Sequence, residues 1–283
     1  MSSASFPFAF RPRKKIDREF VRVLRQMANH TRALTRRSRR ILPVSIHETR
    51  VLIKRCRALL WFAKGTLPAS ELKRARLHLR KASRLLASQR DLAVMRTALK
   101  KLFSDISNPK DRKVLVTIFH APGPGPVTDK KSERSLRQAT SLLLATIGQI
   151  TQSAKTCSKW PSPSDRLAKA FHTTKKAGRK ALHGGKAVQF HNWRKKAKRL
   201  LYQLQLTHPA SNKRMERVIK QVDKLQNELG KYHDSVVTQD HLRKNFSRNM
   251  ARSLARRAAN LLEKRKDRLE KKARKTARHI KPR

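Results

Sequence analysis

Apolar residues recur every three or four positions along most of the chain, which is the pattern of amphipathic helices. The strict apolar–polar alternation of strands is absent, and glycine is scarce, at 8 of 283 residues. Proline and glycine mark boundaries, as at Pro43, Gly65 and Gly184–Gly185. The pattern predicts helices at about 14–40, 46–64, 69–88, 90–104, 131–158, 165–183, 187–207, 212–230, 232–246 and 248–277. The sequence therefore predicts an all-α fold.

A basic motif occurs twice within this helical pattern. Residues 46–60 align with 190–204 at an offset of 144, so that His47, Arg50, Lys54 and Arg55 match His191, Arg194, Lys198 and Arg199. A second match follows at an offset of 143, where Leu86, Asp91 and Val94 match Leu229, Asp234 and Val237. Two ordered matches at one long offset indicate duplicated half-domains rather than a solenoid.

The duplication predicts one domain over residues 10–278, with its first half at about 10–158 and its second at about 163–278. Residues 105–130 have no counterpart in the second half. They include A-P-G-P-G-P at 121–126, which cannot sustain a helix, so we expect an inserted loop or linker. Residues 279–283 form a basic tail, either a solvated end or a further binding segment.

Each motif gathers its cations on one side of its helix. At 100° per residue, with His47 at 0°, Arg50 falls at about −60°, Lys54 at about −20°, Arg55 at about +80° and Arg57 at about −80°. Like charges three and four residues apart repel, and no acidic residue follows at the compensating spacing. A charge run is most often a solvated face, but its recurrence in both halves favours an anion-binding surface.

Phosphate is the anion that these side chains fit. Arginine offers a planar fork of donors and lysine a mobile point charge, and a histidine beside phosphates has its protonated form favoured. Lys81 and Lys224, which match at an offset of 143, are expected to join this surface, as are Arg90 and its counterpart His233. Further candidates are Lys175, Lys176 and Arg179 before the second motif, and Arg18, Arg22 and Arg25 on the first helix.

The overall charge points to a strongly anionic partner. The chain has 71 Lys plus Arg against 18 Asp plus Glu, a formal net charge of +53. A compact body with that charge repels itself unless counterions or a polyanion neutralise it, so nucleic acid, inorganic polyphosphate or an anionic membrane is the expected partner. Hydrophobic residues make up 38% of the chain, enough for a folded core.

Other classes of protein are disfavoured by what the sequence lacks. It shows no Walker A loop, no G-x-S-x-G motif, no carboxylate cluster and no His or Cys cluster at metal spacing, so we expect no enzyme activity, no metal and no cofactor. Cys56 and Cys157 are expected to be reduced thiols, and no secretory signal or membrane span is apparent, so a cytoplasmic protein is expected. Asp91 and Asp234, at predicted helix starts, should cap those helices or pair with a motif arginine.

The two motifs resemble the CHAD family, the conserved-histidine α-helical domains. The resemblance rests on residues 47–57 and 191–204, with support from 86–94, 229–237 and 170–177, and it covers almost the whole chain. It implies two pseudo-symmetric helical bundles whose basic faces line a central groove or pore, inorganic polyphosphate as the ligand, and association with polyphosphate granules in prokaryotic cells. Many members carry a CYTH-type catalytic domain, and we expect a stand-alone member because this sequence has no room for one.

The leading hypothesis is therefore non-enzymatic binding of polyphosphate, without a membrane partner. The alternative is a protein that binds RNA or DNA, because any polyanion gains from counterion release on so basic a surface. RNA-binding modules stack bases on aromatic side chains, and this chain is only 5% aromatic. Trp61 and Trp193 lie within the motif helices and are expected in the core. Protein partners and oligomeric state stay open.

Overall fold

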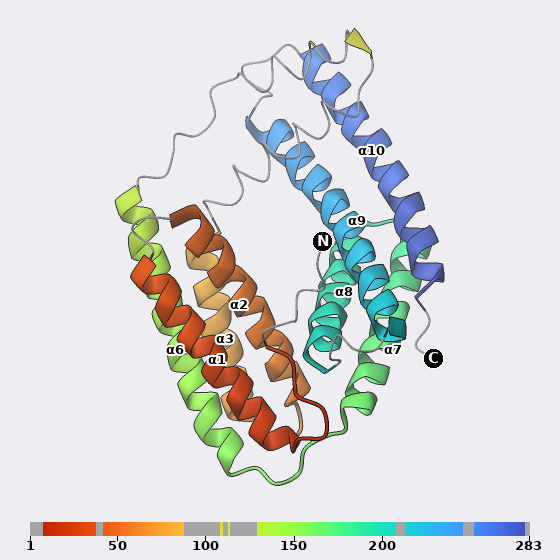
Figure 1. Ribbon diagram of the computed structural model, residues 1–283. Coiled ribbons are helices and arrows are strands. Elements are labelled where there is room, and N and C mark those ends of the chain that lie inside the picture. Colours follow the sequence, from red (N-terminus) through yellow and green to blue (C-terminus); the bar gives the residue numbers. More distant parts are fainter. Residues whose placement is uncertain are drawn as a thin grey trace. The chain divides into compact units, whose positions relative to one another are not determined.

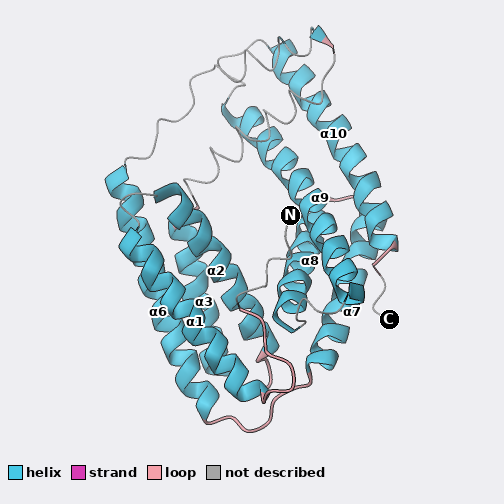
Figure 2. Cartoon of the chain, viewed as in Figure 1, coloured by secondary structure: helices cyan, strands magenta, loops and turns pink. Residues whose placement is uncertain are grey.

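The computed structural model describes residues 8–37, 42–87, 108–109, 113, 129–207, 213–245 and 252–280. Their helices are α1 (Ile16–Arg37), α2 (Leu42–Phe62), α3 (Ala69–Leu85), α6 (Asp129–Lys155), α7 (Pro163–Gly184), α8 (Ala187–Thr207), α9 (Lys213–Asn245) and α10 (Arg252–Arg278) (Figure 1). No strand occurs in this part of the chain (Figure 2). The all-α prediction is confirmed. None of the described helices is long and apolar enough to cross a membrane.

Helix boundaries mostly lie within a few residues of their predicted positions. Pro43 is an exception, since it falls in the first turn of α2 rather than before the helix. Proline is tolerated there because the first N–H groups of a helix have no intrahelical partner. At the turn between α7 and α8, Gly185 has φ +61° and donates its N–H to the carbonyl of Ala181 at 2.9 Å, which is how glycine ends a helix.

Helix α9 differs from the prediction in a way that changes the role of Asp234. The sequence predicts a break near Gly230, whereas α9 runs unbroken from Lys213 to Asn245. A glycine inside a helix costs about 1 kcal/mol relative to alanine, and burial of neighbours such as Leu229 and Tyr232 offsets that cost. Asp234 therefore lies in a helix interior, and the prediction that it caps a helix start is wrong. Asp91, the helix predicted at 90–104 and nearly all of the 105–130 insertion lie outside the described residues.

The chain divides into two compact units. Unit 1 contains the described residues within Met1–Gln89, Val127–Ala170 and Arg199–Ile219, and unit 2 those within Arg90–Pro126, Phe171–Lys198 and Lys220–Arg283. The last two turns of α8 thus belong to unit 1, whereas the sequence assigns the whole helix to the second half. The duplicated halves, and the groove or pore between their basic faces, stay predictions.

Unit 1 is built around a bundle of four helices. Helices α1 and α3 pack against α6, and α2 packs against all three. Fully buried side chains from each helix meet in one core, among them Phe20 and Leu24, Leu52 and Ile53, Leu79, and Leu143. The end of α8 joins this unit, because Leu206 enters the core and its carbonyl accepts a hydrogen bond from the N–H of Phe10 at 2.7 Å.

Unit 2 has a core that is richer in aromatic residues. Phe190 and Trp193 from α8 meet Leu229 and Tyr232 from α9, and Leu269 from α10 covers the same core. The rings of Phe190 and Tyr232 stack with their centroids 4.4 Å apart. Stacked pairs of this kind add about 0.5–1.5 kcal/mol beyond the area that they bury. Because the aromatic side of α8 packs into this core, the motif cations lie on the other sides of the helix.

Gly178 in α7 lies where the indole ring of Trp193 crosses that helix. A Cβ at residue 178 would lie 2.8 Å from Cε2 of Trp193, which is fully buried and has no room to move. Gly178→Ala is therefore expected to lower the free energy of unfolding by about 1–3 kcal/mol. In the control Gly148→Ala in α6, the methyl group meets nothing within 4 Å. The higher helix propensity of alanine should therefore raise the free energy of unfolding by up to about 1 kcal/mol. Denaturant unfolding followed by circular dichroism measures both, and shifts of the same sign would contradict this packing.

Candidate functional site

The first motif turns two of its arginines toward α3. Arg57 donates to the carbonyl of Leu79 at 2.9 Å, and Arg50 donates to the carbonyl of Leu86, just past the end of the helix. An arginine at a helix C-terminus satisfies a carbonyl that lacks an intrahelical partner and interacts favourably with the helix dipole. The side of α2 at about −60° to −80° therefore faces α3, where Arg50 is half-buried and Arg57 stays exposed to solvent.

Arg55, at about +80° on the same helix, is held by an aromatic ring. Its guanidinium lies 5.0 Å from the ring centroid of Phe8, within the range of a cation–π contact. Tyr202 from α8 lies beside it at the wall of a small pocket that Phe8 and Arg55 also line. Burial lowers the pKa of the Arg55 guanidinium from its ordinary value, against a smaller opposing effect of Tyr202. The group keeps its positive charge, since arginine is not deprotonated in proteins.

Arg199, which matches Arg55 in the repeat, has the same kind of environment. Its guanidinium lies 4.8 Å from the ring centroid of Trp61 on α2. Burial lowers its pKa, and the nearby positive charge of Arg76 lowers it further. Trp61 is thus partly buried beneath a cation, which corrects the expectation that it packs wholly in the core, whereas Trp193 is fully buried as expected.

The second motif meets α9. The rings of His191 and His233 lie with their centroids 4.5 Å apart. A Cβ built on Gly230 would lie 3.6 Å from Nε of Arg194, so this arginine crosses α9 at the glycine. In the sequence match, Gly230 aligns with the residue that follows Leu86, whose carbonyl accepts the hydrogen bond from Arg50. Arg50 and Arg194 also match in the sequence, so each of these two arginines lies close to a matched position.

The other predicted site residues differ in how exposed they are. Lys54 and Lys198 are half-buried, and His47 is exposed on α2. Four further cations are exposed on α3 and α7, namely Lys81, Lys175, Lys176 and Arg179. Lys224 is exposed on α9, but nine residues separate it from His233, so the two lie about 180° apart around the helix and do not share a face. Arg90 lies outside the described residues.

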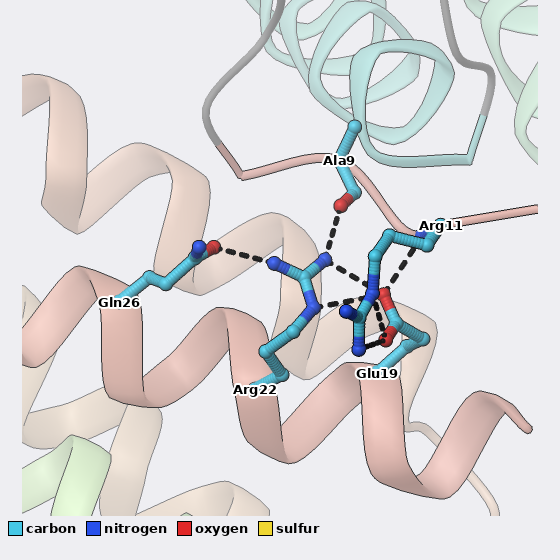
Figure 3. Close-up of polar contacts among 5 residues, drawn as sticks. All are labelled: Ala9, Arg11, Glu19, Arg22 and Gln26. Carbon is cyan, nitrogen blue, oxygen red and sulfur yellow. Dashed lines mark hydrogen bonds and ion pairs between the residues drawn. The ribbon is translucent and has the colours of Figure 1, made fainter. Parts of the chain in front are cut away.

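Arg22, a further candidate for phosphate binding, is instead part of an anchor for the N-terminal segment (Figure 3). Its guanidinium donates to the buried carboxylate of Glu19 at 2.7 Å and to the carbonyl of Ala9 at 2.5 Å. Arg11 donates to the same carboxylate through its backbone N–H at 2.8 Å and its Nε at 2.9 Å. This anchor places Phe8 against Arg55. The sequence carries one signal for it, the Glu19–Arg22 spacing of three within a helix.

Nothing in the described part of the chain suggests a metal centre or a reactive thiol. No group of three or more His, Cys, Asp or Glu residues could hold a metal ion there. Cys56 and Cys157 are free thiols, as predicted. Burial raises the pKa of Cys56 to about 12, so its thiol stays neutral and unreactive at physiological pH.

Comparison with known proteins agrees with this helical, cation-rich architecture. A sequence model of the CHAD domain matches residues 20–243. The fold is similar to the crystal structure of the CHAD domain from the plant Ricinus communis, with a TM-score of 0.68 and 17% identity, covering 96% of this chain and 95% of that one. No curated protein matches. Because the family model spans most of the sequence, the chain belongs to the CHAD domain family.

Proposed function

We propose that this protein binds inorganic polyphosphate through the basic residues of its two motif helices and catalyses no reaction on it. One observation carries the proposal. Arg55 and Arg199 occupy equivalent positions, are half-buried, and lie over aromatic rings without a carboxylate partner among the described residues. A partly desolvated guanidinium that no acid neutralises is stabilised by an external anion, and its fixed orientation lowers the entropic cost of binding one.

Polyphosphate fits these cations better than nucleic acid does. Sequence-tolerant binding of single strands uses exposed aromatic rings on which bases stack. In the described ranges no Phe, Tyr or Trp side chain is fully exposed, and the rings of Phe8 and Trp61 are already covered by Arg55 and Arg199. Among the described residues, the surface therefore offers contacts for phosphate groups and no fully exposed Phe, Tyr or Trp ring on which a base could stack. Association with polyphosphate granules belongs to the same proposal, since a bound polymer would carry the protein to them.

Salt dependence tests the proposal against a generic polycation. Affinity for long-chain polyphosphate and for RNA, compared at equal phosphate concentration, is expected to diverge as salt rises from about 50 to about 500 mM. Polyphosphate should stay bound at salt concentrations that release RNA, because positioned arginines act at short range where screening is weak. Parallel loss of both ligands would contradict the proposal and favour nucleic-acid binding. Incubation of the complex with Mg²⁺ or Mn²⁺ should release no phosphate.

A further inference from the structure

A groove lies between α9 and α10, within unit 2. It has a volume of about 770 Å³. The two helices run antiparallel, because Thr276 bonds Glu228 while Gln239, eleven residues later on α9, bonds Glu263, thirteen residues earlier on α10 (Figure 1). The α9 wall spans Lys220 to Lys231, which corresponds to about 16 Å along the helix. The groove is therefore long enough for a segment of a linear polymer.

Lysines dominate the walls of this groove. Five of them line it, with a histidine at one end: Lys220, Lys224, Lys231, Lys272, Lys275 and His279. None of the five lysines forms an ion pair with any described residue. Two carboxylates also line the groove, so an excess of three positive charges remains even with His279 neutral. Cations that line a concave surface focus the field and raise the local concentration of anions.

Neither carboxylate forms an ion pair with a lysine of the groove. Asp223 accepts hydrogen bonds from the amide groups of Gln226 at 3.0 Å and Asn227 at 3.2 Å. Glu228 is buried at the base of the groove, where its Oε1 accepts a hydrogen bond from the hydroxyl of Thr276 at 3.1 Å. Its Oε2 has no hydrogen-bond partner in the described structure. Both acids thus accept hydrogen bonds from neutral donors, and the lysine ammonium groups stay available.

We infer that the α9–α10 groove is a second polyphosphate-binding site, separate from the motif cations. This inference rests on the proposed function and deepens it. The groove side of α9, marked by Lys224, lies about 180° from His233, which contacts the motif residue His191. The lining residues include no Phe, Tyr or Trp, and Leu269 is their one large apolar side chain, so the groove suits a bare phosphate chain rather than stacked bases.

A protein with more than one polyphosphate-binding site should bind long polymers more tightly than short ones. Once one segment of a long polyphosphate is bound, the second site meets the rest of the same molecule at a high effective concentration. Long chains should then bind about 10²–10⁴-fold more tightly than chains no longer than the groove. Loss of the groove site is expected to lower that difference while leaving the affinity for short chains at the motif cations unchanged.

The first test counts short polyphosphate chains bound per protein by isothermal titration calorimetry. The full-length protein is expected to bind one chain at the groove in addition to those bound at the motif cations. Replacing the five groove lysines with glutamine should lower the number bound by one, and these exposed positions should not need their charge for folding, since removing like charges relieves repulsion. A control has the same net charge and retains the groove: the exposed residues Lys73, Lys131, Lys159, Lys180 and Lys264 are changed to glutamine, and it should bind as many chains as the unchanged protein.

The outcomes separate the inference from the proposed function. If every bound chain is lost when the motif cations are replaced and kept when the groove lysines are replaced, the groove site is overturned and the proposed function stands. If every bound chain is lost with the groove lysines alone, the groove is supported and the motif site is contradicted. No polyphosphate bound, or RNA as the ligand of the groove, would overturn the inference; absence of all polyphosphate binding would overturn the proposed function as well.

A gain of affinity at one residue provides a second test that misfolding cannot imitate. Glu228→Gln keeps an oxygen to accept the hydrogen bond from Thr276 and replaces the unpartnered carboxylate oxygen with an amide donor. Removal of this negative charge from the groove should tighten short-chain binding there by about 3- to 10-fold, without changing the motif site. Unchanged or weaker binding at the groove in a folded Glu228→Gln protein would contradict the inference.

Discussion

Replacing Arg50, Lys54, Arg194 and Lys198 together with glutamine is expected to weaken binding of polyphosphate at the motif helices by about 10²–10³-fold. These residues occupy equivalent positions in the two motifs and cover about 40° of each helix face. A contact between a charged side chain and a phosphate oxygen retains on the order of 1 kcal/mol after desolvation, so four contacts give about 3–4 kcal/mol. Calorimetry with a polyphosphate long enough to contact both motifs reports the loss directly.

A control of the same net charge distinguishes a shaped site from general attraction. Lys73, Lys131, Lys159 and Lys180 are exposed, and they lie outside both the motifs and the α9–α10 groove. Their replacement with glutamine should weaken binding by only a few-fold, through the loss of long-range attraction. Equal losses in the two variants would mean that charge alone binds the polymer, and the motif site would be abandoned.

The bond from Arg50 to the carbonyl of Leu86 complicates the four-residue variant, because its loss removes a cap from α3. A narrower variant, Lys54→Gln with Lys198→Gln, leaves both arginines in place. It should lower affinity by about tenfold, with helical content and melting temperature unchanged. Retained affinity in this variant, combined with a lowered melting temperature in the four-residue variant, would assign the effect of Arg50 to stability rather than to binding.

Periodicity predicts which motif residues share a side of a helix, but not what lies against that side. The positions of Arg50, Arg55 and Arg57 around α2 follow from 100° per residue. Their partners are carbonyls of α3 and the ring of Phe8, which is 47 residues from Arg55 in the sequence. No local pattern carries that information, because it depends on how helices distant in the chain pack together. The all-α fold, in contrast, follows from local propensity and was predictable.

Lys224 is a second residue whose neighbours could not be predicted from the sequence pattern. Its match with Lys81 at a constant offset suggested that both join the motif surface. On α9, however, Lys224 lies on the side that faces α10, where it joins lysines from a helix that begins beyond residue 250. The groove becomes visible once the antiparallel pairing of α9 with α10 is known. The unbroken course of α9 through Gly230 is likewise set by burial of its neighbours, which a residue-by-residue propensity does not include.

Glu19→Gln is expected to lower the free energy of unfolding at neutral pH by about 3 kcal/mol, the largest effect on stability that the described residues predict. Burial of the Glu19 carboxylate would by itself raise its pKa, but hydrogen bonds from Arg22 and Arg11 outweigh burial and lower the pKa from 4.5 to about 2. The folded state therefore holds the ionised form more strongly than the unfolded state does. The resulting stabilisation is complete above pH 4.5 and is lost progressively as the pH falls from 4.5 toward 2.

The glutamine variant should accordingly lose this acid dependence, so that its stability differs from that of the parent at pH 7 and converges with it near pH 2. Glu133→Gln is the matched control, because Glu133 pairs with Arg137 at 3.4 Å on the surface of α6, where an ion pair contributes at most about 0.5 kcal/mol. Urea unfolding at several pH values measures both. Parallel pH profiles for the parent and Glu19→Gln would contradict the assignment of the anchor to the ionised carboxylate. The anchor also places Phe8 beneath Arg55. Glu19→Gln should therefore weaken polyphosphate binding as well, in proportion to the disorder that it introduces in the N-terminal segment. The stability of the anchor and the affinity of the motif site would then be linked.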